Sequence, residues 1–180
     1  MAKTLIDLIS NKTEYTPKRS YEWFMTNVNR GLLNSSYKDR IASKLPALRT
    51  TTIKPGSMLM YGYDAKLKAE LPFWDKFPLI ILTSATDTHF HGFNLHYMPF
   101  KLRLSFLNAL YGADLGKQSQ IIASGAVNQA MKWSIKQYIF SHVRTQFMQI
   151  PQDEWAIACF MPIARFTGAS EQQVWRKGNL

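Results

Sequence analysis

A chain of 180 residues that is 46% hydrophobic and 13% aromatic has enough apolar material for the buried core of one domain, which excludes an intrinsically disordered protein. Its one cysteine, Cys159, excludes an internal disulfide, so we expect assembly inside a cell. The net charge of +10 favours an anionic partner, while the absence of a long apolar run or a signal peptide predicts no membrane partner.

The positive charge lies toward both ends of the sequence. Residues 1–54 carry ten Lys and Arg against four acidic residues, a net charge of +6, and residues 101–180 carry nine against four, a net charge of +5. Residues 55–100 have a net charge of −1. This distribution predicts that the flanks meet an anionic partner, either nucleic acid or the acidic surface of another protein. A surface that only keeps the protein in solution is the alternative.

The first 54 residues are predicted to form a basic, helical extension. After a linker at 11–20, helices are expected at 20–31 and 37–44, on the basis of apolar spacing and of the Gly or Pro that follows each. A short amphipathic helix is expected before them, from Lys3 to Ile9. Its apolar side predicts a partner-binding surface made of Leu5, Ile6, Leu8 and Ile9.

Three consecutive strands are predicted at 58–63, 77–83 and 90–97, each apolar and bounded by Pro, Gly or polar residues. Apolar side chains occupy both alternating faces of the first strand, so we expect both faces to be covered, one by the interior of a barrel and one by a helix. Gly92 in the third strand predicts a bulge or a close backbone approach.

A helix is predicted from Phe100 to Tyr111, because Pro99 is favoured at a helix start. Lys101 and Arg103 fall in its first turn, where the helix dipole disfavours cations, so we expect an acidic partner for them. The remaining pattern predicts a partly helical segment at 113–124, a helix at 127–140, a strand at 144–150, one helical turn at 151–154 and a last strand at 155–161.

This order of elements predicts an α+β fold. We expect a small five-stranded SH3-like β-barrel, or an open sheet, with helices inserted between strands three and four and an N-terminal helical extension. The chain then divides into the basic extension at 1–54, a β core with its helical insertion at 55–162, and a basic C-terminal tail at 163–180.

Catalytic and metal-binding patterns are weak. His89 and His91 share one face of a predicted strand, but no cysteine or group of carboxylates completes a metal site around them. Asp64, Glu70 and Asp75 are expected to pair with the chain's own Lys and Arg instead of with Mg²⁺. The sequence therefore predicts no enzyme, no metal and no cofactor.

Basic residues interleaved with aromatic ones are typical of nucleic-acid surfaces, where cations contact phosphates and aromatic rings stack on bases. If rings such as Trp133 and Tyr138 belong to the core instead, only the cations remain available. The candidate nucleic-acid contacts are Lys18, Arg19, Lys101, Arg103, Lys132, Lys136, Arg144, Arg176 and Lys177.

Several blocks of the sequence resemble a known family. They are LPFWDKFPL at 71–79, GFNLHY at 92–97, KLR at 101–103 and YIFSHVRTQFMQIPQDEWAIACFMP at 138–162. The chain resembles, over about residues 54–176, the virion proteins of T4-like contractile-tailed phages that are known as DNA end protectors or head-completion proteins. No resemblance is found over the first 50 residues.

The resemblance implies a structural virion protein that binds the ends of packaged double-stranded DNA at the head–tail vertex. It also implies other virion proteins as partners in a multi-subunit assembly that forms in the host cytoplasm. The alternative is a tail, tube or baseplate protein, whose basic flanks and N-terminal helix contact neighbouring subunits without any role in DNA binding.

Overall fold

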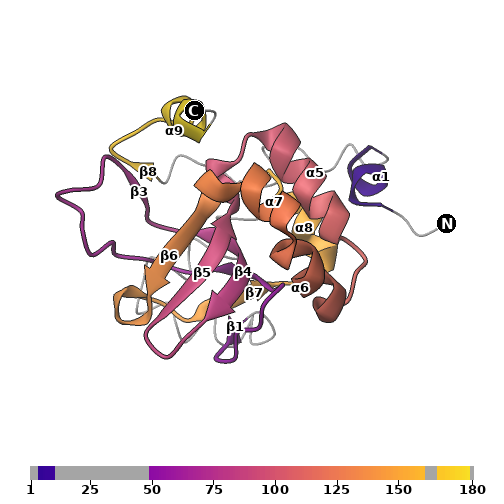
Figure 1. Cartoon of the computed structure of the whole chain (residues 1–180), viewed down its shortest axis with the longest axis horizontal. Helices are drawn as coiled ribbons and strands as arrows, with labels where there is room; N and C mark the ends of the chain where they lie inside the picture. The colour runs from indigo at the N-terminus through magenta and orange to yellow at the C-terminus, as the bar shows by residue number, and fades with distance from the viewer. Residues whose placement is uncertain (1–3, 11–48, 161–165, 179–180) are drawn as a thin grey trace, which may run out of the picture.

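A six-stranded antiparallel sheet forms the centre of the fold (Figure 1). The structure is a computed structural model that describes residues 4–10, 49–160 and 166–178. The strand order is β1-β7-β2-β4-β5-β6, and a separate two-stranded sheet pairs β3 with β8. The strands are β1 (Arg49–Thr50), β2 (Met58–Met60), β3 (Trp74–Asp75), β4 (Leu79–Ala85), β5 (His89–Asn94), β6 (Ile135–Ile139), β7 (Phe147–Ile150) and β8 (Phe166–Thr167).

Helices α1, α5, α6 and α8 gather on one side of the central sheet, whereas β3, β8 and α9 lie at its other end (Figure 1). The α-helices are α1 (Leu5–Ser10), α5 (Phe100–Leu110), α6 (Leu115–Ala123), α7 (Gly125–Ala130), α8 (Trp155–Ala158) and α9 (Glu171–Gly178). Short 3-10 helices are η4 (Leu95–Tyr97), η5 (Lys132–Ser134), η6 (Phe140–His142) and η7 (Gln152–Glu154).

The fold combines a sheet with helices, as predicted, but the sheet is open and does not close into a barrel. In the described residues its edges are β1, which is only two residues long, and β6, and no ladder joins them. An isolated bridge between Tyr63 and Val143 draws the chain after β6 toward the end of β2. One bridge does not make the continuous ladder that a barrel needs, so of the two predicted alternatives the open sheet is confirmed.

The predicted helix at 127–140 is wrong in its second half. Helix α7 ends at Ala130, and Ile135–Ile139 forms β6, which pairs with β5. The segment satisfies both periods, since its apolar residues fit a helical face while Ile135, Tyr138 and Ile139 are strand formers. Pairing of Tyr138 with Phe90 in the sheet decides in favour of the strand.

The predicted last strand at 155–161 is also wrong where the structure describes it, because Trp155–Ala158 forms helix α8. Trp155, Ala156, Ala158 and Cys159 are all buried, and a short run of apolar residues does not distinguish a buried strand from a buried helix. The fourth and fifth core strands are therefore β6 and β7, with α5, α6 and α7 inserted before β6.

Other predictions are confirmed. The helix expected at 100–111 is α5, and the strand and turn expected at 144–154 are β7 and η7. At Gly92, a Cβ atom would lie 2.7 Å from Ile80 Cδ1 and 2.9 Å from the Ile81 carbonyl oxygen. The close backbone approach predicted there is present, next to a register shift between Leu82 and Ser84.

The two faces of the sheet belong to two different cores, so the prediction that both faces are covered is confirmed. The helix-side core lies between the sheet and the helices, with Met58, Leu79 and Phe93 from the sheet and Leu5, Leu107 and Trp155 from the helices. The aromatic core lies on the opposite face and consists of Leu59, Tyr61, Ile80, Leu82, Phe90 and Tyr138, with Phe140, Val143 and Phe147 packed against it.

Helix α1 packs on the chain's own helices α5 and α8. Thr4 and Asp7 cap it, because the Thr4 N–H donates to Asp7 Oδ2 at 2.9 Å and the Asp7 N–H donates to Thr4 Oγ1 at 3.0 Å. Leu5 is fully buried in the helix-side core, while Ile6 is 44% exposed. The rest of the predicted extension, at 1–3 and 11–48, lies outside the described residues.

Candidate nucleic-acid interface

The segment between β2 and β4 projects from one end of the sheet (Figure 1) and lines two neighbouring hollows. A backbone hydrogen bond from the Tyr63 N–H to the Lys76 carbonyl closes the base of the projecting segment at 2.9 Å. One hollow, the aromatic pocket, has a volume of about 420 Å³. It is lined by Tyr63, Ala65, Lys66, Leu67, Leu71, Pro72, Phe73, Trp74, Asp75, Tyr97, Lys136, Gln137, Tyr138 and Ile139.

Five aromatic side chains contribute to the pocket wall, Tyr63, Phe73, Trp74, Tyr97 and Tyr138. Phe73 packs on Tyr97 with ring centroids 5.9 Å apart, and Phe166 of β8 packs edge-on against both rings. Tyr63 packs edge-on against Tyr138 at 5.0 Å. Trp74 is only partly buried, and no other aromatic ring of the described residues packs on it. The pocket therefore contains braced rings and one ring with free surface.

Buried hydrogen bonds fix the floor of the pocket. Asp75 accepts from the Phe77 N–H at 3.0 Å and from Asn94 Nδ2 at 3.1 Å, and its Oδ2 lies 2.7 Å from His96 Nδ1. Asn94 Nδ2 also donates to the Tyr138 hydroxyl at 3.0 Å. Because these side chains are buried and bonded to one another, they anchor the Tyr138 ring at the pocket floor.

Lys136 on β6 supplies a positive charge to the pocket. Its ammonium group lies 4.3 Å from the centre of the Tyr97 ring, a cation–π contact. No carboxylate of the described part of the chain forms an ion pair with it. Burial without such a partner lowers the pKa of Lys136, since desolvation disfavours the charged form. An anion in the pocket would offset this cost.

The second hollow, the basic hollow, shares Tyr63 and Trp74 with the aromatic pocket and has a volume of about 410 Å³. Its other lining residues are Gly62, Asp64, Lys68, Lys76, Phe77, Arg144 and Thr145. It contains three cationic side chains and one acidic one, so its net charge is positive.

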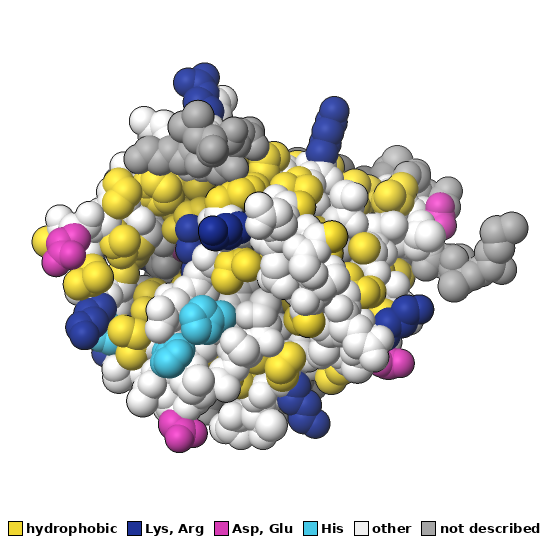
Figure 2. All heavy atoms as spheres, viewed as in Figure 1, with side chains coloured by type: hydrophobic (Ala, Val, Ile, Leu, Met, Phe, Trp, Pro, Cys, Tyr) yellow, Lys and Arg dark blue, Asp and Glu magenta, His cyan; other side chains and the backbone are white. Residues whose placement is uncertain are grey.

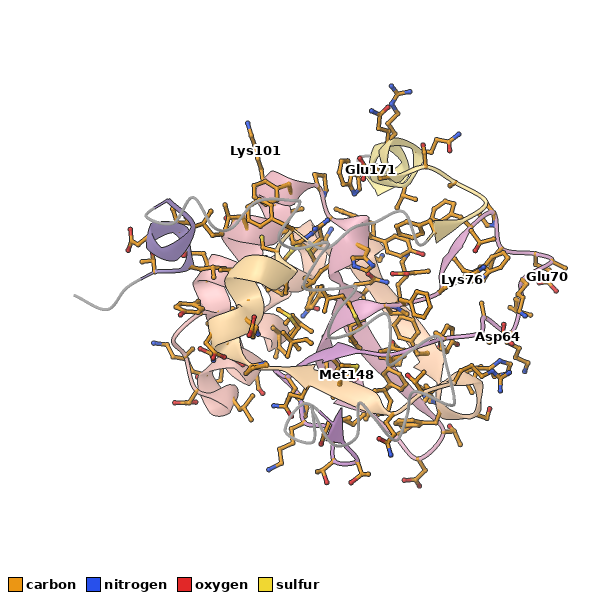
Figure 3. All side chains as sticks on the ribbon, turned by 180° about the vertical axis from the view of Figure 1, so that it is seen from behind. Asp64, Glu70, Lys76, Lys101, Met148 and Glu171 are labelled. Atoms are coloured by element: carbon orange, nitrogen blue, oxygen red, sulfur yellow. The ribbon has the colours of Figure 1, made fainter. Side chains whose placement is uncertain are left out.

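Asp64 is held by two of these cations. It forms an ion pair with Lys68, and Arg144 Nη2 donates to its Oδ2 at 3.0 Å. The hydrogen bonds from Lys68 and then Arg144 lower the pKa of Asp64. Figure 3 shows that Lys76 and Asp64 come from the same projecting segment, which carries Glu70 farther out. Lys76 has no such ion pair within the described residues, so it is available to an anionic ligand.

Figure 2 shows how side chains of different types are distributed on one face of the molecule. On the face in view, hydrophobic side chains gather on the side where the projecting segment lies, with Lys or Arg side chains among them. Leu67 and Leu71 at the rim of the aromatic pocket are 48% and 40% exposed. Exposed apolar surface beside cations is typical of a ligand-binding region.

Comparison with known proteins now gives the family. The profile of the phage T4 terminal DNA protecting protein family matches residues 1–178. The chain belongs to this family. The match includes the first 50 residues, in which the sequence blocks give no resemblance. No curated protein and no solved structure matches the chain significantly.

Two of the predicted DNA contacts line the hollows. Lys136 lies in the aromatic pocket and Arg144 in the basic hollow. Lys101, Lys132 and Arg176 are exposed on α5, η5 and α9. Figure 3 shows Lys101 on the far side of the molecule from Lys76 and Asp64. Lys18 and Arg19 lie outside the described residues, and the Lys177 side chain is not described.

Arg103 has a structural role: among the described residues it forms no ion pair with the acidic partner expected for it, and Glu171 acts on it only as a nearby charge. Its side chain is 2% exposed, and it donates to the carbonyl oxygens of Leu95 at 2.9 Å, Cys159 at 2.8 Å and Met98 at 3.0 Å. Burial lowers the pKa of the guanidinium to about 10, so it is charged at neutral pH. The guanidinium joins α5 to η4 and α8, and its donors are not available to DNA.

Two of the four residues predicted to bind a partner through α1 pack against the chain's own helix-side core. Leu5 is buried and Ile9 packs against the helix-side core, whereas Ile6 is exposed. The Leu8 side chain is not described. Only Ile6 of the described members is therefore available to another protein.

Catalytic chemistry finds no support at either hollow. The described residues contain no group of three or more His, Cys, Asp or Glu side chains that could hold a metal ion. His89 and His91 do share a face, with ring centroids 5.3 Å apart. Burial raises the pKa of the Cys159 thiol to about 11, which is unlike an activated nucleophile. Among the described helices, none is long and apolar enough to span a bilayer.

The aromatic pocket is not predicted from the sequence, because the charge distribution places the anionic partner at the basic flanks and residues 55–100 have a net charge of −1. The pocket combines residues from this stretch with Lys136 and Tyr138 of β6, a strand that the sequence pattern concealed. The detectable signal was the block LPFWDKFPL, which places Trp74 after apolar residues and two positions before Lys76. The missed residues are Tyr63, Lys66, Lys68, Phe73, Trp74, Lys76 and Tyr97.

Proposed function

We propose that this protein is a structural virion protein that binds the ends of linear phage DNA, and that the projecting segment with its two hollows contacts the DNA. The observation that carries the proposal is the shared wall. Tyr63 and Trp74 separate a hollow lined by aromatic rings from a hollow lined by Lys68, Lys76 and Arg144. Stacking surface beside phosphate-binding cations is the combination with which proteins hold nucleic-acid strands.

The charges of this surface favour phosphate binding without sequence selection. Lys66, Lys68, Lys76 and Arg144 are exposed, and Asp75 is buried and satisfied by the protein's own donors. Lysine and arginine contacts to phosphates release counterions, so the affinity must fall as the salt concentration rises. The basic flanks of the chain, with net charges of +6 at 1–54 and +5 at 101–180, add to this attraction.

The test compares linear duplex DNA with a covalently closed circle of the same sequence. We expect tighter binding to the linear form, a steep loss of affinity with salt, and protection of the linear ends from an exonuclease. The double variant Lys68→Gln/Lys76→Gln should weaken binding and reduce the slope of log K against log salt by roughly 1–2. The control, Lys54→Gln/Lys117→Gln, removes the same charge from exposed positions outside both hollows.

Two outcomes would contradict the proposal. Equal affinity for circles and linear molecules, without protection of ends, would remove end binding as the function. If the control pair weakened binding as much as the Lys68 and Lys76 pair, DNA binding would be a property of the whole basic surface and not of the projecting segment.

The location at the head–tail vertex, other virion proteins as partners and assembly in the host cytoplasm also belong to this proposal. Support comes from the family and from the partly unused apolar side of α1, where Ile6 is exposed. Locating the protein in an intact particle by electron microscopy tests the proposal. Density at the tail tube or baseplate would favour the assembly role without DNA.

We also propose kinship with SH3-like folds. The support is the element order of β2, β4 and β5, then a helical insertion, β6, the single turn η6 and β7. Superposition of an experimental structure on SH3-like barrels tests this kinship, and failure of the five strands to superpose would contradict it.

A further inference from the structure

We propose that the aromatic pocket receives the terminal nucleotide of a DNA strand, with its base stacked on the partly buried Trp74 ring and its phosphate beside Lys136. This inference rests on the proposed binding of DNA ends and identifies the part of the ligand that makes an end different from the rest of the duplex.

The walls of the pocket fit a nucleobase. A volume of about 420 Å³ is within the range of small-molecule sites, and five aromatic rings contribute to the lining. Phe73, Tyr97 and Tyr138 are braced by other rings, whereas Trp74 keeps free ring surface at the wall shared with the basic hollow. A base has two flat π-faces and stacks on such a ring whatever its identity, which suits a protein that protects ends of any sequence.

The charge of the pocket calls for an anionic ligand as well as an aromatic one. Lys136 is partly buried above Tyr97, and no carboxylate of the described residues pairs with it. Burial lowers the pKa of Lys136, because desolvation disfavours its charged form. An aromatic side chain of a protein partner would fill the apolar part and leave Lys136 unpaired. A nucleotide supplies the ring and the negative charge together.

Stacking in a pocket also explains how ends are distinguished from internal duplex. Inside a duplex both faces of every base are covered by neighbouring pairs, and exposing one costs unstacking and unpairing energy. At an end the last base has one uncovered face and frays easily. The adjacent basic hollow, with Lys68, Lys76 and Arg144, then lies where the next phosphates of the same strand would pass.

The experiment uses two DNA probes of one sequence, a hairpin with one open end and a dumbbell closed by loops at both ends. Binding of the full chain is measured by fluorescence anisotropy at fixed salt. We expect Trp74→Ala to lower the preference for the open end by about 5- to 140-fold, the range that corresponds to ~1–3 kcal/mol of base stacking. Trp74→Phe keeps a stacking ring and should restore most of the preference.

A second readout reports on the base itself. 2-Aminopurine at the terminal position of the open end should be quenched on binding to the wild type and to Trp74→Phe, but not on binding to Trp74→Ala. Lys136→Met should weaken binding to an open end that carries a terminal phosphate more than to one that ends in a hydroxyl. Lys117→Met, which removes an exposed charge outside both hollows, is the matched control and should change neither.

The outcomes separate the inference from the function on which it rests. If the wild type does not prefer the open end, the proposed function fails. If the wild type prefers the open end and folded Trp74→Ala keeps that preference and the quenching, the pocket does not hold the terminal base and the inference is overturned. The same holds if Trp74→Ala loses a virion protein partner but retains end preference, because the pocket then binds protein.

Discussion

The two faces of the central sheet are covered in different ways. The helix-side core consists mainly of aliphatic, Met and Phe side chains and is closed by α1, α5 and α8. The aromatic core on the other face is built around Tyr61, Phe90 and Tyr138, and through Tyr138 it continues into the aromatic pocket. The first face is sealed, whereas the second leads to the surface. The comparison suggests that stability depends more on the first face and ligand binding on the second.

The buried cation on each side shows the same difference. Arg103, on the helix side, donates one hydrogen bond from each of its three side-chain nitrogens to a carbonyl oxygen of the chain itself. Lys136, at the pocket, has a cation–π contact but no counter-charge among the described residues. A charge that the fold satisfies is structural, and one that the fold leaves unpaired is available to a ligand.

The largest effect is expected at Arg103. Arg103→Met leaves the carbonyl oxygens of Leu95, Met98 and Cys159 without their donor, so the free energy of unfolding should fall by at least ~3 kcal/mol. Lys101→Met, two residues earlier on the exposed side of α5, should change it by no more than ~0.5 kcal/mol. Urea unfolding measures both. Similar small losses in the two variants would show that the buried guanidinium does not hold the helices together.

Alkaline pH should test how well the helix-side core excludes water. Burial raises the pKa of Cys159 from 9 to about 11, so its contribution is present below pH 9 and is lost as the pH rises toward 11. The difference in unfolding free energy between wild type and Cys159→Ala should shrink by ~2–3 kcal/mol over that interval. A difference that stays constant from pH 8 to 11 would mean that the thiol is accessible to water in the folded state.

A substitution at Gly92 tests the close approach of β5 to β4 within the central sheet. Gly92→Ala places a Cβ within 2.9 Å of the Ile81 carbonyl oxygen and should cost ~1–3 kcal/mol of stability. Gly125→Ala, at the start of α7, meets no atom within 4 Å and should be neutral or slightly stabilising. Thermal unfolding of both variants measures the effect. Equal stability of the two would exclude a close approach of the strands.

The smallest effect on stability is expected at Lys136, where the substitution should stabilise the fold, whereas the substitutions at Arg103 and Gly92 should destabilise it. Lys136→Met removes a partly buried charge without a counter-charge, so stability at neutral pH should rise by a few tenths to ~1 kcal/mol while binding to DNA ends weakens. Because the pKa is lowered, this gain should disappear as the pH rises toward the ordinary value for lysine and the side chain becomes neutral. A loss of stability would show that the ammonium group supports the fold.

The sequence by itself determined the first three core strands, the covering of both their faces, helix α5 after Pro99 and the family. These features depend on local signals such as the alternation of apolar residues, the positions of Pro and Gly, and continuous sequence blocks. Such signals are complete within one segment and do not depend on residues far away in the sequence. Only the tertiary structure decided that Ile135–Ile139 is a strand, that Trp155–Ala158 is a helix and that the barrel stays open. The apolar pattern of Ile135–Ile139 and of Trp155–Ala158 fits both a helix and a strand. Contacts with β5 decide the first segment, and contacts with the helix-side core decide the second.

The candidate site was decided in the same way. Trp74, Tyr97 and Lys136 lie far apart in the sequence, and no spacing rule connects them. The pairing of β6 with β5, the contact of β3 with β8 and the buried bonds of Asp75 bring them around one pocket. The charge counts of the sequence indicate an anionic partner. Only the structure shows that Arg103 is buried and therefore does not belong to the cations that can bind this partner.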